Sequence, residues 1–178
     1  MPRKPNFQRA FADLMDLEGW GNAHQVEGDS GGLTVYGIAR NYNPEMYEDG
    51  PPSEAEARQF YRETNWYPLR LDEMHSHAMA FEVLEFSVNS GDGSGYEHAV
   101  RIAQVATNEV QSLRWPGKPL LAVDGRIGPR TLADMNHVAL RGYERPWVKF
   151  FNHYQLDYYM SLSDDLQRRF LLGWTRRV

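Results

Sequence analysis

The chain has 178 residues and a formal net charge of −5, with 42% hydrophobic and 24% charged residues and no cysteine. These values are typical of an ordinary soluble globular protein. They exclude disulfides, thiolate metal sites and a cysteine nucleophile, and no stretch approaches the roughly 18 apolar residues of a membrane-spanning helix.

The charge is unevenly distributed along the chain. Residues 1–90 hold 7 Lys/Arg and 15 Asp/Glu, a balance of −8, whereas residues 91–178 hold 12 and 9, a balance of +3. A basic half suits an anionic partner, although surface charge also varies without a functional reason. The acidic overall balance argues against nucleic acid as the main ligand. Because no apolar segment follows the basic residues of the N-terminus, we expect no secretory signal.

The first predicted helix carries an apolar stripe with the i, i+4, i+7, i+8 spacing of an amphipathic helix. The stripe consists of Phe7, Phe11, Leu14 and Met15. Gly19 and Gly21 end this helix, so Glu18 lies at its C-terminal end. The glycine-rich residues 20–38 contain the alternating run LTVY at 33–36, which predicts a small β-hairpin.

The rest of the chain predicts helices separated by glycine- and proline-rich turns. Ser53 and Glu56 form a capping box that opens a helix to about residue 65. Apolar spacing and first-turn prolines predict the later helices. These are expected around Met79–Phe86, Ile102–Leu113, Pro129–Val138 and Pro146–Met160, with a last helix capped by Ser163. The predicted fold is therefore mainly α with one small β element.

Glu18, Asp29 and Thr34 are the candidate catalytic residues. Glycoside hydrolysis needs a carboxylic acid on a rigid element, facing a second polar group across a sugar cleft. Glu18 fits the general acid if apolar surface helps it keep its proton. A glutamate at a helix C-terminus is electrostatically unfavourable, which favours a functional reason for it.

The second polar group is less strictly defined by the sequence. Asp29 can orient or activate the attacking water and Thr34 can hold that water through its hydroxyl, an inverting arrangement. An alternative for Asp29 is an Asx-turn residue beside glycines. Glu27 is a competing second carboxylate.

Aromatic faces stack on pyranose rings, so Tyr36 and Trp66 are candidate substrate-binding residues, although most aromatic residues of a chain belong to its core. Asn89 is a candidate hydrogen-bonding partner for an N-acetyl or hydroxyl group. Asp124 and Gly125 predict a tight turn that starts a helix. The six histidines show no metal-ligand spacing, so we predict no metal site and no cofactor.

Seven short motifs resemble, in order, glycoside hydrolase family 108, the phage and bacterial N-acetylmuramidases. They are EG at 18–19, DSGG at 29–32, TVYGI at 34–38, WYPLR at 66–70, FSVNSG at 86–91, DGRIGPRT at 124–131 and GWTRR at 173–177. The DGRIGPRT string is similar to the signature turn of small peptidoglycan-binding helical modules. The family's catalytic glutamate maps onto Glu18. In this chain Trp20 replaces the second glycine of the usual E-G-G.

The resemblance implies a lysozyme-like helical fold with a small β-hairpin lobe near the active site. It implies a catalytic lobe at 1–90 and a helical peptidoglycan-binding-like lobe at 91–178, packed against it. The implied activity is cleavage of the β-1,4 bond between N-acetylmuramic acid and N-acetylglucosamine in peptidoglycan glycan strands. A monomeric endolysin is expected, without stable membrane insertion. It would accumulate in the host cytoplasm and act in the periplasm or cell wall after a holin opens the membrane.

Three alternatives stay open. A bacterial muramidase could open the wall for secretion with the same chemistry. A catalytically inactive wall-binding or virion structural protein could keep the fold and the basic half. A lytic transglycosylase also relies on one glutamate but leaves 1,6-anhydro ends, and the presence of Asp29 and Thr34 favours hydrolysis over it.

Overall fold

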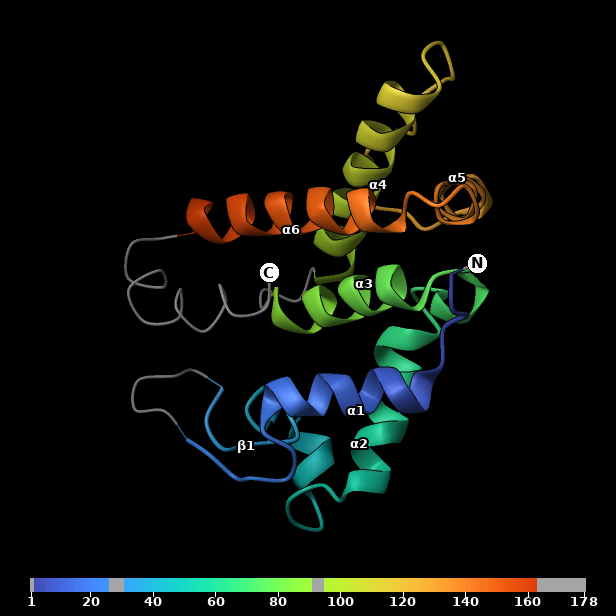
Figure 1. Ribbon diagram of the computed structural model, residues 1–178. Helices are drawn as coiled ribbons and strands as arrows, with labels where there is room; N and C mark the ends of the chain where they lie inside the picture. The colour runs from blue at the N-terminus through green and yellow to red at the C-terminus, as the bar shows by residue number, and fades with distance from the viewer. Residues whose placement is uncertain (1, 26–30, 91–94, 163–178) are drawn as a thin grey trace. The chain divides into compact units, whose positions relative to one another are not determined.

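The computed structural model describes residues 2–25, 31–90 and 95–162, which pack as two compact units (Figure 1). Residues 7–68 form one unit, here called the hairpin unit. The described residues among 2–6 and 69–162 form the other, here called the helical unit. No described helix combines the length and apolar character needed to cross a membrane.

The hairpin unit combines two α-helices with a two-stranded antiparallel hairpin. Its elements are α1 (Phe7–Glu18), β1 (Thr34–Val35), β2 (Ile38–Ala39), the 3₁₀ turn η1 (Pro44–Tyr47), α2 (Glu54–Tyr61) and the π-helical turn η2 (Arg62–Trp66). Figure 1 shows the hairpin beside the C-terminal end of α1. The predicted apolar stripe is buried in the core of this unit, which explains why α1 forms.

The predicted capping box opens α2. The Ser53 hydroxyl accepts from the Glu56 N–H, and the Glu56 carboxylate accepts from the Ser53 N–H at 2.7 Å. Two otherwise unpaired donors of the first helical turn are satisfied in this way. The helix then passes directly into η2, where the Tyr67 N–H donates to the Arg62 carbonyl at 3.0 Å.

The helical unit consists of longer elements. They are the 3₁₀ turn η3 (Leu71–Glu73), α3 (His77–Asn89), α4 (Gly95–Arg114), α5 (Pro129–Leu140) and α6 (Glu144–Ser161). Helices α3, α4 and α6 pack against one another, and α6 crosses α4 in Figure 1. The inner face of α6 repeats every fourth residue and is fully buried. It consists of Trp147, Phe151, Gln155 and Tyr159.

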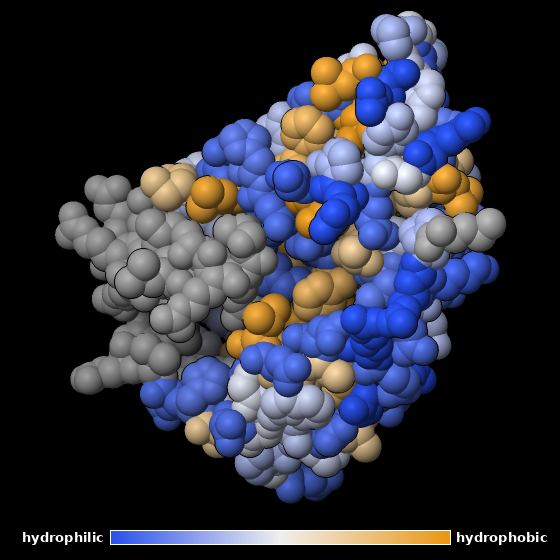
Figure 2. Space-filling view, in the orientation of Figure 1, coloured by the Kyte–Doolittle hydropathy of each residue, from blue (hydrophilic) through white to orange (hydrophobic). Residues whose placement is uncertain are grey.

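The structure confirms a mainly α fold with a small antiparallel hairpin. Helix α6 begins at Glu144, two residues before the predicted Pro146, because proline is tolerated anywhere in a first helical turn. Leu113 was expected on the apolar stripe of α4 but is 68% exposed. Figure 2 shows apolar side chains at the surface near this end of α4. The helix predicted from Ser163 lies outside the described residues.

The compact units divide between Pro68 and Leu69. Packing therefore groups α3 with the helices that follow it. The predicted division into a catalytic lobe at 1–90 and a wall-binding lobe at 91–178 stays a prediction.

Candidate active site

Glu18 is the last residue of α1, and the chain turns sharply after it. Gly19 and Trp20 both have left-handed backbones, with φ of 82° and 55°, and both N–H groups donate to the Met15 carbonyl. A left-handed tryptophan is uncommon and costs backbone energy. Its indole is held by a 2.8 Å hydrogen bond to Asp16 and by edge contact with Phe11. The exit from α1 is therefore fixed by side chains of the helix itself.

The hairpin turn consists of Tyr36 and Gly37. Their φ angles are 53° and 74°, and the flanking residues Val35 and Ile38 are paired across the hairpin. Two successive positive φ values are what a type I′ turn requires, which matches the twist of a tight two-residue hairpin. The predicted hairpin is confirmed, and Gly37 lies in its turn.

This turn lies directly against the Glu18 side chain. A Cβ atom added to Gly37 would stand 3.1 Å from Glu18 Cγ and 3.2 Å from Glu18 Oε2. The same atom would stand 2.7 Å from the Tyr61 hydroxyl. The half-buried Glu18 carboxylate, the Gly37 backbone and the Tyr61 hydroxyl thus meet at one point. Only glycine leaves room there and also adopts this backbone at low cost.

Tyr61 is a site residue that the sequence analysis missed. It is 2% exposed, lies beside the Phe11 ring, and its hydroxyl donates to the Tyr36 carbonyl at 2.9 Å. This bond ties α2 to the turn that faces Glu18. The available signal was the i, i+4 spacing of Ala57 and Tyr61, because a tyrosine on a buried face needs a partner for its hydroxyl.

Thr34 lies on the strand that leads into the turn. Its N–H and carbonyl are both paired with His24, at 2.9 and 3.0 Å, so the backbone position of Thr34 is fixed from both sides. Its half-exposed hydroxyl has the Gly32 carbonyl at 3.4 Å. Asp29 and the competing Glu27 lie outside the described residues, so their roles stay predictions.

Tyr36 and Trp66 differ in what they can offer a sugar. The half-exposed Tyr36 ring lies against Gly21, where an added Cβ would stand 2.7 Å from the tyrosine hydroxyl. Trp66 is 3% exposed and meets Phe7 edge-on in the core of the hairpin unit. A buried ring has no open face for stacking on a sugar. Trp66 is therefore not included in the candidate site.

Asn89 belongs to the helical unit, at the C-terminal end of α3. Its amide donates to the Glu85 carbonyl at 3.0 Å and to Glu85 Oε1 at 2.9 Å. The other carboxylate oxygen of the buried Glu85 accepts from Gln155 at 2.9 Å. Asn89 is thereby held in a fixed orientation by the core, and its predicted role toward substrate stays a prediction.

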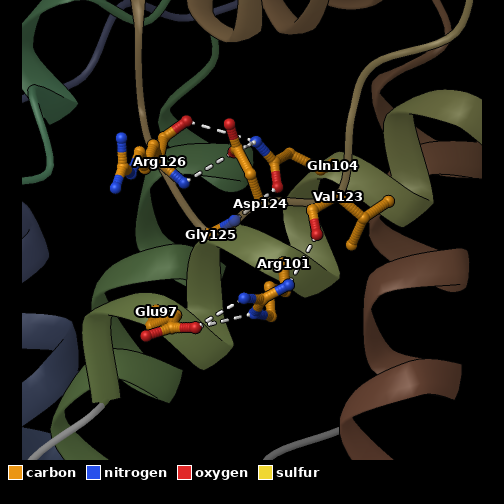
Figure 3. A network of polar contacts seen from close by, with 7 residues as sticks. All are labelled: Glu97, Arg101, Gln104, Val123, Asp124, Gly125 and Arg126. Carbon is orange, nitrogen blue, oxygen red and sulfur yellow. Dashed lines mark hydrogen bonds and ion pairs between the residues drawn. The ribbon is translucent and has the colours of Figure 1, made fainter.

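The DGRIGPRT string of residues 124–131 forms a hydrogen-bonded loop that leads into α5 (Figure 3). The Gln104 amide donates to Asp124 at 2.7 Å and accepts from the Gly125 N–H at 3.0 Å. The Gln104 and Arg126 hydrogen bonds hold the pKa of the Asp124 carboxyl below its usual range. A Cβ on Gly125 would stand 2.5 Å from Glu97. The motif therefore shapes a turn that starts a helix, as predicted.

Residues of the same polar network also anchor the preceding loop. Asn108 of α4 exchanges two hydrogen bonds with the backbone of Leu121, at 2.8 and 2.9 Å. Arg101 donates to the Val123 carbonyl and pairs with Glu97. Within the described ranges, no cluster of three or more His, Asp or Glu residues has an arrangement that could hold a metal ion.

Comparisons with known proteins give two family matches and a structural match. The family described as Glycosyl hydrolase 108 matches residues 11–91, and the family described as Predicted Peptidoglycan domain matches residues 98–178. Among solved structures, the chain is similar to "Structure of Brucella abortus SagA", with a TM-score of 0.67 and 23% identity over 96% of this chain and 90% of that one. At that identity the likeness shows the fold alone. No curated protein matches the sequence significantly. The first half of the chain thus matches the Glycosyl hydrolase 108 family, and the second half matches the predicted peptidoglycan domain.

Proposed function

We propose that this protein is a muramidase, a peptidoglycan hydrolase that cleaves the β-1,4 bond between N-acetylmuramic acid and N-acetylglucosamine, with Glu18 as the general acid. The two family matches support the general part of this proposal, a glycosidase that acts on peptidoglycan. One observation supports the specific part, the assignment of Glu18 as the general acid. The Glu18 carboxylate lies against a fixed hairpin turn, at the point where Gly37 and Tyr61 meet.

Each described residue has a definite task in this mechanism. Glu18 protonates the glycosidic oxygen as the bond to the sugar breaks. Tyr61 fixes the turn, because its hydroxyl donates to the Tyr36 carbonyl. A fixed turn restricts the directions in which the Glu18 carboxyl can point, and such positioning lowers the barrier without further chemistry.

The remaining steps use the residues predicted from the sequence. Asp29 activates the attacking water, and the Thr34 hydroxyl helps to hold that water. The exposed part of the Tyr36 ring stacks on a pyranose ring. In an inverting enzyme, the two carboxyl groups stand about 6.5–9.5 Å apart to leave room for the water.

The test is mass spectrometry of fragments released from purified sacculi by the wild type and by Glu18→Gln. The wild type should release fragments with reducing N-acetylmuramic acid ends. Glu18→Gln should release them at least about 100-fold more slowly, since general acid catalysis contributes that much or more. Glu48→Gln is the matched control, because Glu48 is an exposed glutamate of the same unit.

The other outcomes assign the protein to the alternatives. Fragments with 1,6-anhydro ends would indicate a lytic transglycosylase. Equal release by the wild type and Glu18→Gln would remove Glu18 from the mechanism. Absence of fragments from a wild-type protein that still binds sacculi would favour a wall-binding or structural protein.

A further inference from the structure

Helix α6 has two faces of opposite character. Its inner face is buried against α3 and α4, as described above. Its other side carries Arg145, Lys149 and His153, which are all exposed. Residues at i, i+4 and i+8 lie above one another on a helix, so the three basic side chains form one row. The row lies on the half of α6 nearest its N-terminus.

The row borders a hollow in the surface. The described residues that line it are the three basic ones with Pro146 and Phe150, and its volume is about 770 Å³. Binding sites for small ligands typically measure about 300–1,000 Å³. The half-buried Phe150 ring and the Pro146 ring give this hollow an apolar surface among the basic groups. None of the described candidate catalytic residues lines it.

The two strongest bases of the row are not neutralised by a described carboxylate. Elsewhere, helix arginines pair with a glutamate on the same helix, as in Arg58–Glu54 and Arg101–Glu97, both at 2.6 Å. Arg145 and Lys149 have no ion-pair partner among residues 2–25, 31–90 and 95–162.

Two acidic residues of α6 lie near the row without neutralising it. Glu144, next to Arg145, accepts a hydrogen bond from the Ser76 hydroxyl, which directs its carboxylate to a partner outside the row. Asp157 stands 3.6 Å from His153, and both side chains are largely exposed. Counting the described residues only, the Arg145 and Lys149 end of the row therefore keeps an excess of positive charge beside an apolar surface.

We propose that this hollow binds the carboxylate-bearing stem peptides of peptidoglycan. The proposal rests on the proposed function, since it takes the same polymer as ligand. Arg145 and Lys149 would pair with peptide carboxylates, and Phe150 and Pro146 would contact the aliphatic parts of the peptide. Charge complementarity selects the stem peptides, because uncharged sugar rings of the glycan strand gain little from two neighbouring cations. The hollow lies inside the region that matches the predicted peptidoglycan domain.

The experiment measures binding of the full chain to purified sacculi, in a Glu18→Gln background so that the sacculi stay intact. The test variant is Arg145→Gln/Lys149→Gln. The matched control is Lys4→Gln/Arg141→Gln, which removes one exposed lysine and one exposed arginine charge elsewhere in the helical unit. Each protein is titrated onto sacculi with stem peptides and onto the peptide-free glycan strands that an amidase releases from them, with the lactyl carboxylates exposed by the amidase capped as amides. Thermal unfolding by circular dichroism checks that each variant is folded.

The test variant should bind intact sacculi about tenfold more weakly than its parent, and added salt should reduce the difference because the groups are exposed. The parent should lose a similar factor on the capped peptide-free strands, where the test variant should lose nothing more. If the control lost as much binding as the test variant, the loss would come from general surface charge, and the proposal would be overturned. Unchanged binding by a folded test variant would also overturn it, as would equal binding of the parent to both preparations.

A second assay separates this proposal from the proposed function. With Glu18 intact, the test variant should cleave peptide-free glycan strands as fast as the wild type does. If the wild type cleaves nothing while the binding difference is present, the muramidase assignment fails and the stem-peptide site stands. If cleavage is normal while the binding difference is missing, the site fails and the muramidase assignment stands.

Discussion

The two units of this protein differ in where they place strained backbone and buried polar side chains. In the hairpin unit, the non-glycine residues with left-handed backbones, Trp20 and Tyr36, lie next to Glu18 or in the turn that faces it. Such conformations cost about 1–3 kcal/mol each and persist where the surroundings hold them. The unit thus concentrates its backbone strain around one carboxylate.

The helical unit also has a non-glycine residue with a left-handed backbone, Arg70, but most of its buried polar side chains lie inside regular helices. Glu85 is 1% exposed and accepts hydrogen bonds from Asn89 and Gln155, and Gln104 holds the loop before α5. Buried polar groups that are fully hydrogen-bonded specify how elements pack. Fixed backbone geometry therefore positions a reactive carboxylate in the hairpin unit, whereas fixed hydrogen bonds position packed helices in the helical unit. The following predictions test this division.

Gly37→Ala should have the largest effect on activity. The new Cβ would meet Glu18 and Tyr61, so cleavage of sacculi should fall about 100-fold, as expected for displacing a catalytic group by about 1 Å. Gly142→Ala is the matched control, because Gly142 has a similar φ of 82° but nothing within 4 Å of an added Cβ. Both variants should lose about 1–2 kcal/mol of stability from the left-handed backbone.

The two glycine variants are compared by initial cleavage rates and by chemical denaturation. Only Gly37→Ala should lose activity. Equal activity in the two variants would show that the contact between the turn and Glu18 has no catalytic importance, and the contrast between the units would lose its main support.

Tyr61→Phe should have a smaller effect on the same site. Removing the hydroxyl leaves the Tyr36 carbonyl without this donor, which should cost about 1 kcal/mol of stability and about tenfold in cleavage rate. Tyr67→Phe is the control, because the Tyr67 side chain is 55% exposed. A Tyr61→Phe enzyme with unchanged rate but reduced stability would make this bond structural only.

Glu82→Gln tests the helical unit and should leave the cleavage rate unchanged. Burial, together with the neighbouring Glu85, raises the pKa of Glu82 to about 8 from a usual value of 4.5. Since the folded protein holds this proton up to about pH 8 and the unfolded chain releases it near 4.5, stability is lost as the pH rises between these values.

A glutamine at position 82 carries no such proton. Its amide oxygen can also still accept a hydrogen bond from Asn152, whose amide reaches position 82 at 3.0 Å when it is turned to donate. The variant should therefore melt a few degrees above the wild type at pH 8 and at nearly the same temperature at pH 5, by thermal unfolding. Glu48→Gln, at an exposed position, should show no difference at either pH. A constant offset at both pH values would mean that ionisation of Glu82 is not the cause.

The elements of both units could be predicted because they depend on local patterns. The apolar stripe of α1 and the Ser53 capping box each depend on a short stretch of neighbouring residues, and the structure confirms both. The position of Glu18 at the end of α1 follows from the glycine after it. Local residue spacing is therefore enough to identify Glu18 as the candidate acid.

The surroundings of Glu18 could not be predicted because they depend on contacts between distant segments. Neither the approach of Gly37 to Glu18 nor the bond from Tyr61 to Tyr36 has a signature within a short window. The environment of Trp66 could not be predicted from its residue type either. Its residue type suits a sugar-binding platform, but packing against Phe7 places it in the core.

The two amide side chains on α4 that hold the loop before α5 have a practical consequence. Gln104 fixes residues 124–126 and Asn108 fixes Leu121, so both anchors act at the far end of this loop. Its near end, at Pro116 and Gly117, is exposed. Exposed loop tips are where inserted residues are best tolerated. A short peptide tag or a fluorophore placed there would report where the protein settles on a cell wall without loosening the core.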